Sequence, residues 1–94
     1  MKILTLNLRK EYFNEILLGK KKEEFREVKP YWDKRLNKKY DLVIIKCGYP
    51  KKNDKTKEII FKWNGYEKRK IVHKHFGNKA VEVYAIKLNE KIEK

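Results

Sequence analysis

Asp41-Leu42-Val43-Ile44-Ile45-Lys46-Cys47 contains the longest aliphatic run in the chain, from Leu42 to Ile45. Four aliphatic residues in a row are typical of a strand that is buried on both faces of a sheet. The run is also far shorter than the ~18 apolar residues that a membrane-spanning helix needs. We therefore expect a central strand over residues 41–47.

The segments after this strand predict further strands. Asn64-Gly65 is the strongest short signal for a β-hairpin turn, because both residues tolerate the positive φ angles that a tight turn requires. Strands are expected on either side of it, over residues 57–63 and 66–72, and a last strand is expected over residues 80–88. The remaining segments predict a polar loop over 51–56, a loop over 73–78 and a frayed tail over 89–94.

The segments before the central strand predict a strand followed by a helix. Residues 2–8 alternate enough in polarity to form a first strand. Apolar residues then recur at the spacing of one helical face, which predicts a short helix over residues 10–18; they are Phe13, Ile16 and Leu17. Gly19 follows directly, where a residue in the left-handed conformation typically ends a helix.

The middle of the chain completes the expected set of elements. Residues 21–28 look extended, and Pro30 favours a short helical turn over residues 31–36. The chain would thus hold five or six strands, one helix after the first strand and a short second helical turn. This order predicts a single α+β domain over residues 1–94, with a mostly antiparallel sheet that is curled or barrel-like.

Charge is the strongest signal in the composition. Lysine and arginine number 26 against 13 acidic residues, which gives a formal net charge of +13. A surface that is merely rich in lysine would be rich in glutamate too, so the excess of base points to a polyanionic partner, and RNA is the one we expect. The basic residues do not line one amphipathic helix, which argues against a membrane surface. The lack of an apolar leader predicts a cytoplasmic protein.

Several residues that often carry chemistry are expected to have structural roles here. His73 and His75 lack a cysteine or a clustered carboxylate beside them and make a poor zinc site, so we expect no metal and no cofactor. Cys47 ends an apolar strand and is expected to pack as a small hydrophobe. Trp32 and Trp63 are expected to pack as well, with Trp32 also a candidate for the edge of a cleft. A monomer is expected.

Gly19-Lys20-Lys21-Lys22-Glu23-Glu24-Phe25-Arg26 is the segment richest in candidate site residues. Glu24 and Arg26 are two residues apart, so a strand points both to the same face. A carboxylate beside a guanidinium orients it and still leaves donors for a ligand. Lys21 lies at the turn after Gly19 and is free to reach the same place. The alternative is a solvated, charged edge strand that resists aggregation.

Four residues of this segment, Gly19, Lys21, Glu24 and Arg26, match the pattern G-x-K-x-x-E-x-R. This pattern resembles the signature of the ASCH domain (activating signal cointegrator homology), a branch of the PUA-like β-barrels. Further pieces, in order along the chain, resemble the small prokaryotic and phage members of that family; they are Leu6-Asn7-Leu8 with the helix 11–18, and residues 26–32, 40–41, 48–49, 75–78 and 81–86. Together these pieces cover most of the chain.

The resemblance implies a small PUA-like β-barrel with a cleft beside the helix that follows the first strand, and RNA or a nucleotide as the ligand. Lys21 and Arg26 would contact phosphate or base. Glu24 would orient Arg26 or accept a hydrogen bond from a base amino group. Tyr49 follows a strand-ending glycine and is a candidate to stack on a base, with a lid over the core as the alternative.

Two other functions stay open. Some relatives of the ASCH type are enzymes, among them a small bacterial type that hydrolyses acetylated cytidine with a lysine and a threonine three residues later. Glu24 stands at that threonine position here, and a carboxylate is not an equivalent nucleophile. In a ribonuclease, Lys21, Tyr49 and His75 would supply the base and the cations. The second alternative is an adaptor whose basic face docks an acidic protein.

Overall fold

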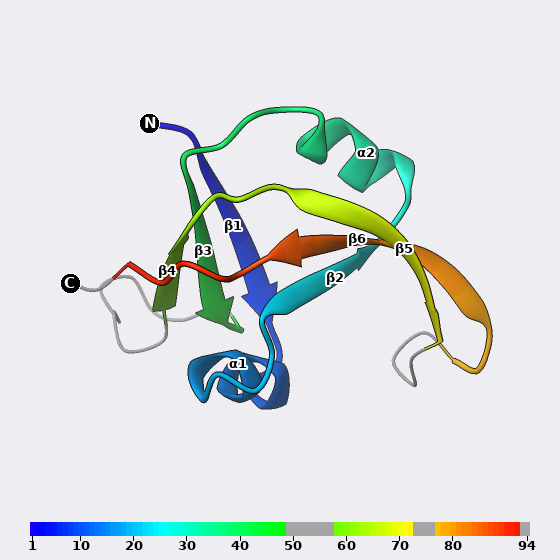
Figure 1. Ribbon diagram of the computed structural model, residues 1–94, viewed down its shortest axis with the longest axis horizontal. Helices are drawn as coiled ribbons and strands as arrows, with labels where there is room; N and C mark the ends of the chain where they lie inside the picture. Colours follow the sequence, from blue (N-terminus) through cyan, green and yellow to red (C-terminus); the bar gives the residue numbers. More distant parts are fainter. Residues whose placement is uncertain (49–57, 73–76, 93–94) are drawn as a thin grey trace.

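The fold combines six strands and two short helices in the described part of the chain (Figure 1). The computed structural model describes residues 1–48, 58–72 and 77–92. The strands are β1 (Ile3–Leu8), β2 (Glu23–Glu27), β3 (Leu42–Cys47), β4 (Glu58–Lys62), β5 (Tyr66–Val72) and β6 (Ala80–Lys87), and the helices are α1 (Lys10–Leu17) and α2 (Pro30–Leu36). The α+β class is confirmed, and each predicted strand and helix is found with small differences at its ends.

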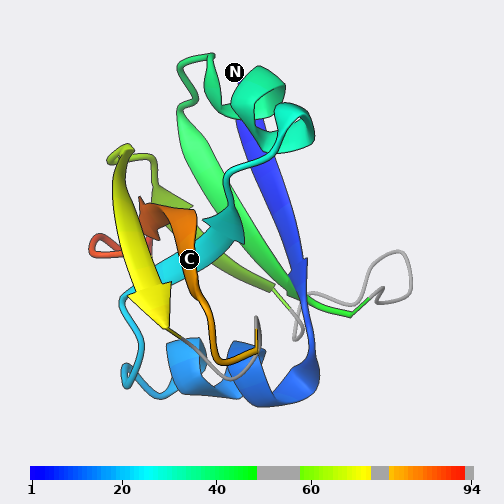
Figure 2. The same ribbon diagram turned by 90° about the vertical axis from the view of Figure 1, so that its right-hand side faces the viewer.

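The strands form two three-stranded sheets, in the orders β1-β3-β4 and β2-β6-β5. β1 and β3 run parallel, with Leu4 opposite Val43 and Leu6 opposite Ile45, and the other three pairings are antiparallel. The aliphatic run thus occupies the central strand of its sheet, as predicted. The two sheets cross each other, with α1 and α2 at opposite ends of the molecule (Figure 2).

The hairpin predicted at Asn64-Gly65 is wrong. β4 pairs with β3 and β5 pairs with β6, so the chain passes from one sheet to the other at this point. Gly65 does adopt a positive φ of 81°. Asn64 Nδ2, however, donates to Asn89 Oδ1 at 2.6 Å, in the segment that follows β6. The edge of β4 that a hairpin partner would occupy is taken by that same segment.

The residues after β6 return to β4 and connect the two sheets. The Lys62 N–H donates to the Glu90 carbonyl at 2.8 Å, and the Ile92 N–H donates to the Ile60 carbonyl at 2.8 Å. The sequence predicts a frayed tail over residues 89–94, but its described part is held in place because the edge of β4 offers backbone groups that need partners.

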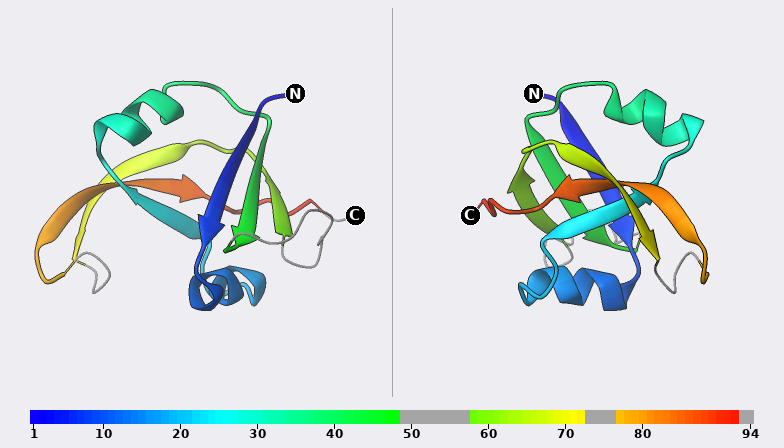
Figure 3. Two further views of the ribbon diagram at one scale, coloured as in Figure 1. Left: turned by 180° about the vertical axis from the view of Figure 1, so that it is seen from behind. Right: turned by 45° about the vertical axis from the view of Figure 1, so that its right-hand side comes forward.

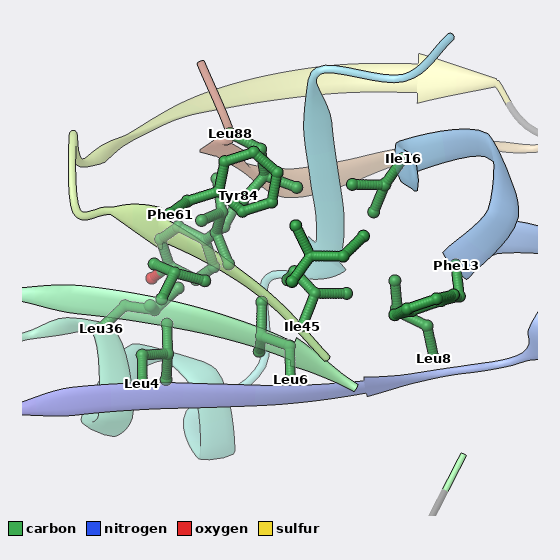
Figure 4. Close-up of a cluster of buried hydrophobic side chains, with 13 residues drawn as sticks. Leu4, Leu6, Leu8, Phe13, Ile16, Leu36, Ile45, Phe61, Tyr84 and Leu88 are labelled. Carbon is green, nitrogen blue, oxygen red and sulfur yellow. The ribbon is translucent and has the colours of Figure 1, made fainter. Parts of the chain in front are cut away.

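The core lies between the two sheets, where side chains from both meet (Figure 4). Alternate residues of β1 point inward, so Leu4 and Leu6 are buried while Thr5 is half-buried. β6 supplies Tyr84 and Ile86 from the opposite side. The other buried members of this cluster are Leu8, Phe13, Ile16, Leu36, Val43, Ile45, Ile59, Phe61 and Leu88. Among the described residues, no side chain of β2 belongs to the cluster.

α1 lies beneath the carboxyl ends of β1 and β3 (Figure 3) and buries Phe13 and Ile16. Gly19 ends it with a φ of 75°. The Lys20 N–H donates to the Glu15 carbonyl at 2.9 Å, and the Gly19 N–H donates to the Ile16 carbonyl at 3.0 Å. These two bonds form a Schellman motif, which a left-handed glycine allows. The motif turns the chain from α1 into β2.

α2 is a seven-residue helix that begins at Pro30 and is held by hydrogen bonds from two tyrosines. The Tyr84 hydroxyl, on β6, donates to the Asp33 carboxylate. The Tyr40 hydroxyl donates to the Arg35 carbonyl at 2.6 Å, near the end of the helix. Neither helix in the described residues is long and apolar enough to cross a membrane.

Tyr84→Phe is expected to lower the free energy of unfolding by about 2 kcal/mol at neutral pH, because it removes a hydrogen bond to the charged carboxylate of Asp33. That bond, with burial as the second cause, raises the pKa of Tyr84 to about 12 from its ordinary value of 10.0. Because folding raises this pKa, the hydrogen bond stabilises the protein fully at pH values below the pKa of the unfolded state. The contribution is lost as the pH rises through the pKa of the folded state. The difference between the two proteins should therefore shrink between pH 10.0 and about 12.

Urea unfolding of both proteins over a series of pH values measures this difference. Tyr66→Phe is the control, because it keeps the ring that packs edge-to-face with the Tyr84 ring, at 4.9 Å between centroids. A difference that stays constant up to pH 12 would contradict the assignment of this hydrogen bond.

Candidate functional site

A cleft of about 460 Å³ opens between β1 and β2, which are the edge strands of their sheets in the described part of the chain. Its lining residues come from β1, α1, β2 and α2 and from the segments that join them. Figure 2 shows the blue β1 and the cyan β2, with α1 below them and α2 above. Its volume falls in the usual range of small-ligand sites. The residues that line it are Asn7, Leu8, Arg9, Tyr12, Lys21, Glu24, Phe25, Arg26, Glu27, Lys29 and Trp32.

Glu24 is the one buried charged residue among those described, with 5% of its surface exposed. The register of β2 on β6 pairs Glu24 with Ile86 and Arg26 with Tyr84. Paired residues of an antiparallel sheet point to the same side, and Ile86 and Tyr84 belong to the core. β2 therefore directs a carboxylate and a guanidinium to the side where β6 directs core side chains.

Each oxygen of the Glu24 carboxylate contacts a different cation. Lys21 Nζ lies 3.2 Å from Oε1, and Arg26 Nη2 lies 3.0 Å from Oε2. The carboxylate thus compensates one of two positive charges and fixes the positions of both side chains. We call Lys21, Glu24 and Arg26 the charged triad.

Arg26 connects the charged triad to β1 and to α2. Its Nη2 also donates to the Asn7 carbonyl at 3.2 Å, at the end of β1. The centre of its guanidinium lies 5.1 Å from the centroid of the Trp32 ring, within the range of a cation–π interaction. Its Nε is buried and has no hydrogen-bond partner among the described residues. Buried N–H groups are almost always paired, so this one indicates a side chain that is not optimised for stability alone.

Lys21 lies close to two aromatic rings. Its Nζ is 5.3 Å from the ring centroid of Tyr12 and 5.4 Å from that of Phe25. Its N–H donates to the Glu15 carbonyl at 3.2 Å, directly after the turn at Gly19. The end of α1 therefore sets the position of Lys21, which reaches Glu24 from outside the strand.

The rim of the cleft carries two exposed cations, Arg9 and Lys29. Lys29 Nζ lies 3.4 Å from the Glu27 carboxylate, an exposed ion pair of little net strength. Among the described residues that line the cleft, four cationic side chains stand against two carboxylates. The cleft is therefore electropositive and favours an anionic ligand.

This arrangement suits the binding of a planar anion better than covalent catalysis. The rings supply flat walls, and the cations supply hydrogen-bond donors. An ammonium group paired with a carboxylate has no lone pair with which Lys21 could attack a substrate. Each oxygen of Glu24 is paired with a cation, which stabilises the carboxylate and makes it poorly suited to act as a base.

Three of the predicted site residues, Lys21, Glu24 and Arg26, come together in the cleft, and Trp32 lines it too. Tyr49 and His75 lie outside the described residues, so their roles stay predictions. Cys47 is half-buried and packs against the core. No group of three metal-binding side chains occurs in the described ranges.

Asn7, Arg9 and Tyr12 also line the cleft and were not predicted as site residues. They come from the end of β1 and the start of α1, and only the fold brings these elements to the same cleft as the charged triad. The one local signal is that Arg9 and Tyr12 are three residues apart at the start of a helix, where such residues share a face.

Comparisons with known proteins find no relative. No protein-family model matches the chain, and neither the curated proteins nor the solved structures contain a significant match. The resemblance to the ASCH family therefore rests on the matching pieces of this sequence and stays a prediction.

Proposed function

We propose that the cleft binds a nucleotide of RNA, with the base among the aromatic rings and the phosphate at the rim. The charged triad offers donors to the carbonyl and ring-nitrogen acceptors of a base. The exposed Arg9 and Lys29 would pair with phosphate oxygens. The net charge of +13 would attract the chain to any polyanion before the cleft engages.

One observation carries this proposal: β2 uses two core-facing positions for Glu24 and Arg26. Replacing a buried ion pair with apolar residues of similar size is often neutral or even stabilising. Stability therefore does not account for the pair. The two residues lie where the edges of the two sheets leave a cleft, which is where a ligand would need them.

The two alternative functions have less support. An enzyme that used Lys21 as a nucleophile would first have to separate it from Glu24. An adaptor for an acidic protein needs a broad exposed face, whereas the charged triad lies inside a cleft, with Glu24 out of reach.

The barrel expected from the ASCH resemblance belongs to the same proposal. Residues 90–92 already connect the sheets on the β4 side. β1 and β2 would then be the two neighbouring edge strands of a barrel-like fold that do not pair, and the cleft would lie between them. We propose that the domain acts there as a monomer.

Arg26→Ala is expected to weaken the binding of a short single-stranded RNA about tenfold, which corresponds to about 1.4 kcal/mol, the strength of one hydrogen bond to a charged group. Lys62→Ala is the matched control. It also removes one positive charge, but from an exposed position on β4 in the other sheet, so it should change the affinity less than about twofold. Fluorescence titrations of the two variants and the wild type with RNA and matched DNA measure this.

Arg26→Lys keeps the charge but loses the planar fork of donors, so it should also weaken binding if it folds as the wild type does. Equal small losses of affinity in the Arg26 and Lys62 variants would overturn the proposal, because the affinity would then come from the net positive charge of the chain and not from the cleft. RNA cleavage or release of a modified base would favour the enzyme. Binding to an acidic polypeptide but to no nucleic acid would favour the adaptor.

A further inference from the structure

A series of cations and aromatic rings continues from the cleft along α2. The Trp32 ring is flanked by two guanidinium groups, that of Arg26 at 5.1 Å and that of Arg35 at 5.8 Å from its centroid. Arg35 also lies 5.1 Å from the centroid of the Tyr31 ring, and the two rings meet edge-on at 5.0 Å. We call Arg26, Trp32, Arg35 and Tyr31 the stacking ladder.

The outer end of the stacking ladder lies in solvent. Tyr31 is 59% exposed, and it is neither in the core cluster nor among the residues packed on it. Trp32, one residue later, packs partly against the core and lines the cleft. The ladder therefore leads from the buried charged triad to an exposed ring that contributes little to the folded core.

The chain around the ladder is strongly basic. Five exposed cations occur between residues 29 and 39; they are Lys29, Lys34, Arg35, Lys38 and Lys39. The one carboxylate in this range is that of Asp33, and it accepts the hydrogen bond from Tyr84. An exposed ring beside so many cations is the combination that single-stranded nucleic acids bind, with bases on rings and phosphates on cations.

We infer that the stacking ladder is a second nucleotide site, and that the ligand is therefore an extended single strand of RNA and not a free nucleotide. This inference rests on the function proposed for the cleft. One base would occupy the cleft, and the neighbouring base would stack on the ring of Tyr31 or on the guanidinium plane of Arg35. Lys34, Lys38 and Lys39 would pair with the phosphates of the same strand. A duplex would not fit, because its bases are already stacked and paired.

Tyr31→Ala is expected to weaken the binding of a short single-stranded RNA about tenfold, because one base loses the ring on which it stacks. It should leave the binding of a nucleoside monophosphate unchanged, because the monophosphate uses only the cleft. Arg26→Ala, in contrast, should weaken both ligands, since both use the cleft. Tyr31→Phe keeps the ring and should bind as the wild type does. Tyr31→Leu keeps apolar bulk without a π face and should lose nearly as much as Tyr31→Ala.

A second measurement reports on the ladder directly. The chain has two tryptophans, so Trp63→Phe leaves Trp32 as the only tryptophan emitter. Single-stranded RNA should change the emission of Trp32 more than the nucleoside monophosphate does, because only the RNA strand contacts both ends of the stacking ladder. In Tyr31→Ala this difference between the two ligands should disappear.

The two proposals fail in distinguishable ways. If strand and monophosphate bind the wild type equally well, or if Tyr31→Ala weakens both to the same extent, the second site is wrong and the cleft proposal stands. If neither ligand binds, the function proposed for the cleft is wrong, and the inference about α2 falls with it.

Discussion

Replacing Glu24 with alanine is expected to lower the free energy of unfolding by about 3 kcal/mol. It should also reduce the affinity for RNA to the value that the net positive charge of the chain gives without the cleft. Without its carboxylate, Lys21 and Arg26 would face each other as like charges with no anion between them. Breaking a buried ion pair typically costs about 3–5 kcal/mol. We expect the lower end, because the side chains of Lys21 and Arg26 remain 19% and 21% exposed and water screens them in part.

Glu67 provides a matched control for Glu24. It also contacts two cations, with Arg69 Nη2 at 2.8 Å and Lys87 Nζ at 3.6 Å, but its side chain is 51% exposed. The hydrogen bond from Arg69 lowers the pKa of Glu67 below its ordinary value. Water nevertheless screens such an exposed pair, so Glu67→Ala should cost far less stability than Glu24→Ala. Urea unfolding at neutral pH compares the two variants, and equal losses would show that the burial of Glu24 has no special effect.

The positions of the strands and helices followed from the sequence because each pattern is local. The aliphatic run of Leu42–Ile45 marks β3, and Gly19 ends α1 with the backbone conformation that only glycine adopts readily. The pairing of the strands did not follow from the sequence, because each strand edge can pair with more than one other strand and the local sequence does not decide which. Asn64-Gly65 meets the local requirements of a hairpin, yet β5 pairs with β6 and residues 90–92 occupy the edge of β4.

The candidate site was predictable in part for the same reason. Lys21, Glu24 and Arg26 are close in sequence, so strand alternation and one turn were enough to bring them together. Their environment was not predictable. Hydrophobic patterning alone would turn Phe25, the one apolar residue of β2, into the core, but the register on β6 places Glu24 and Arg26 on that side. A charged pair on the core side is a conflict between pattern and fold, and such conflicts are typical of functional sites.

The affinity for single-stranded RNA is expected to fall roughly 50-fold when the salt concentration rises about fourfold, for a strand that contacts about four phosphates. Each phosphate neutralised on a single strand contributes about −0.7 to the slope of log affinity against log salt, because condensed counterions are released. Arg9 at the rim and the exposed cations between residues 29 and 39 are the side chains available for these contacts. Titrations at a series of salt concentrations measure the slope.

Two variants decide whether this slope comes from the site or from the net charge of +13. Arg9→Ala removes a cation at the rim of the cleft and should make the slope shallower by about 0.7, one phosphate contact. Lys62→Ala removes the same charge from an exposed position on β4 that does not line the cleft, and it should leave the slope unchanged. Equal changes in both variants would mean that total charge, and not the cleft, attracts the strand. A nucleoside monophosphate should give a much shallower slope than the strand, because it fills the cleft without reaching the cations along α2.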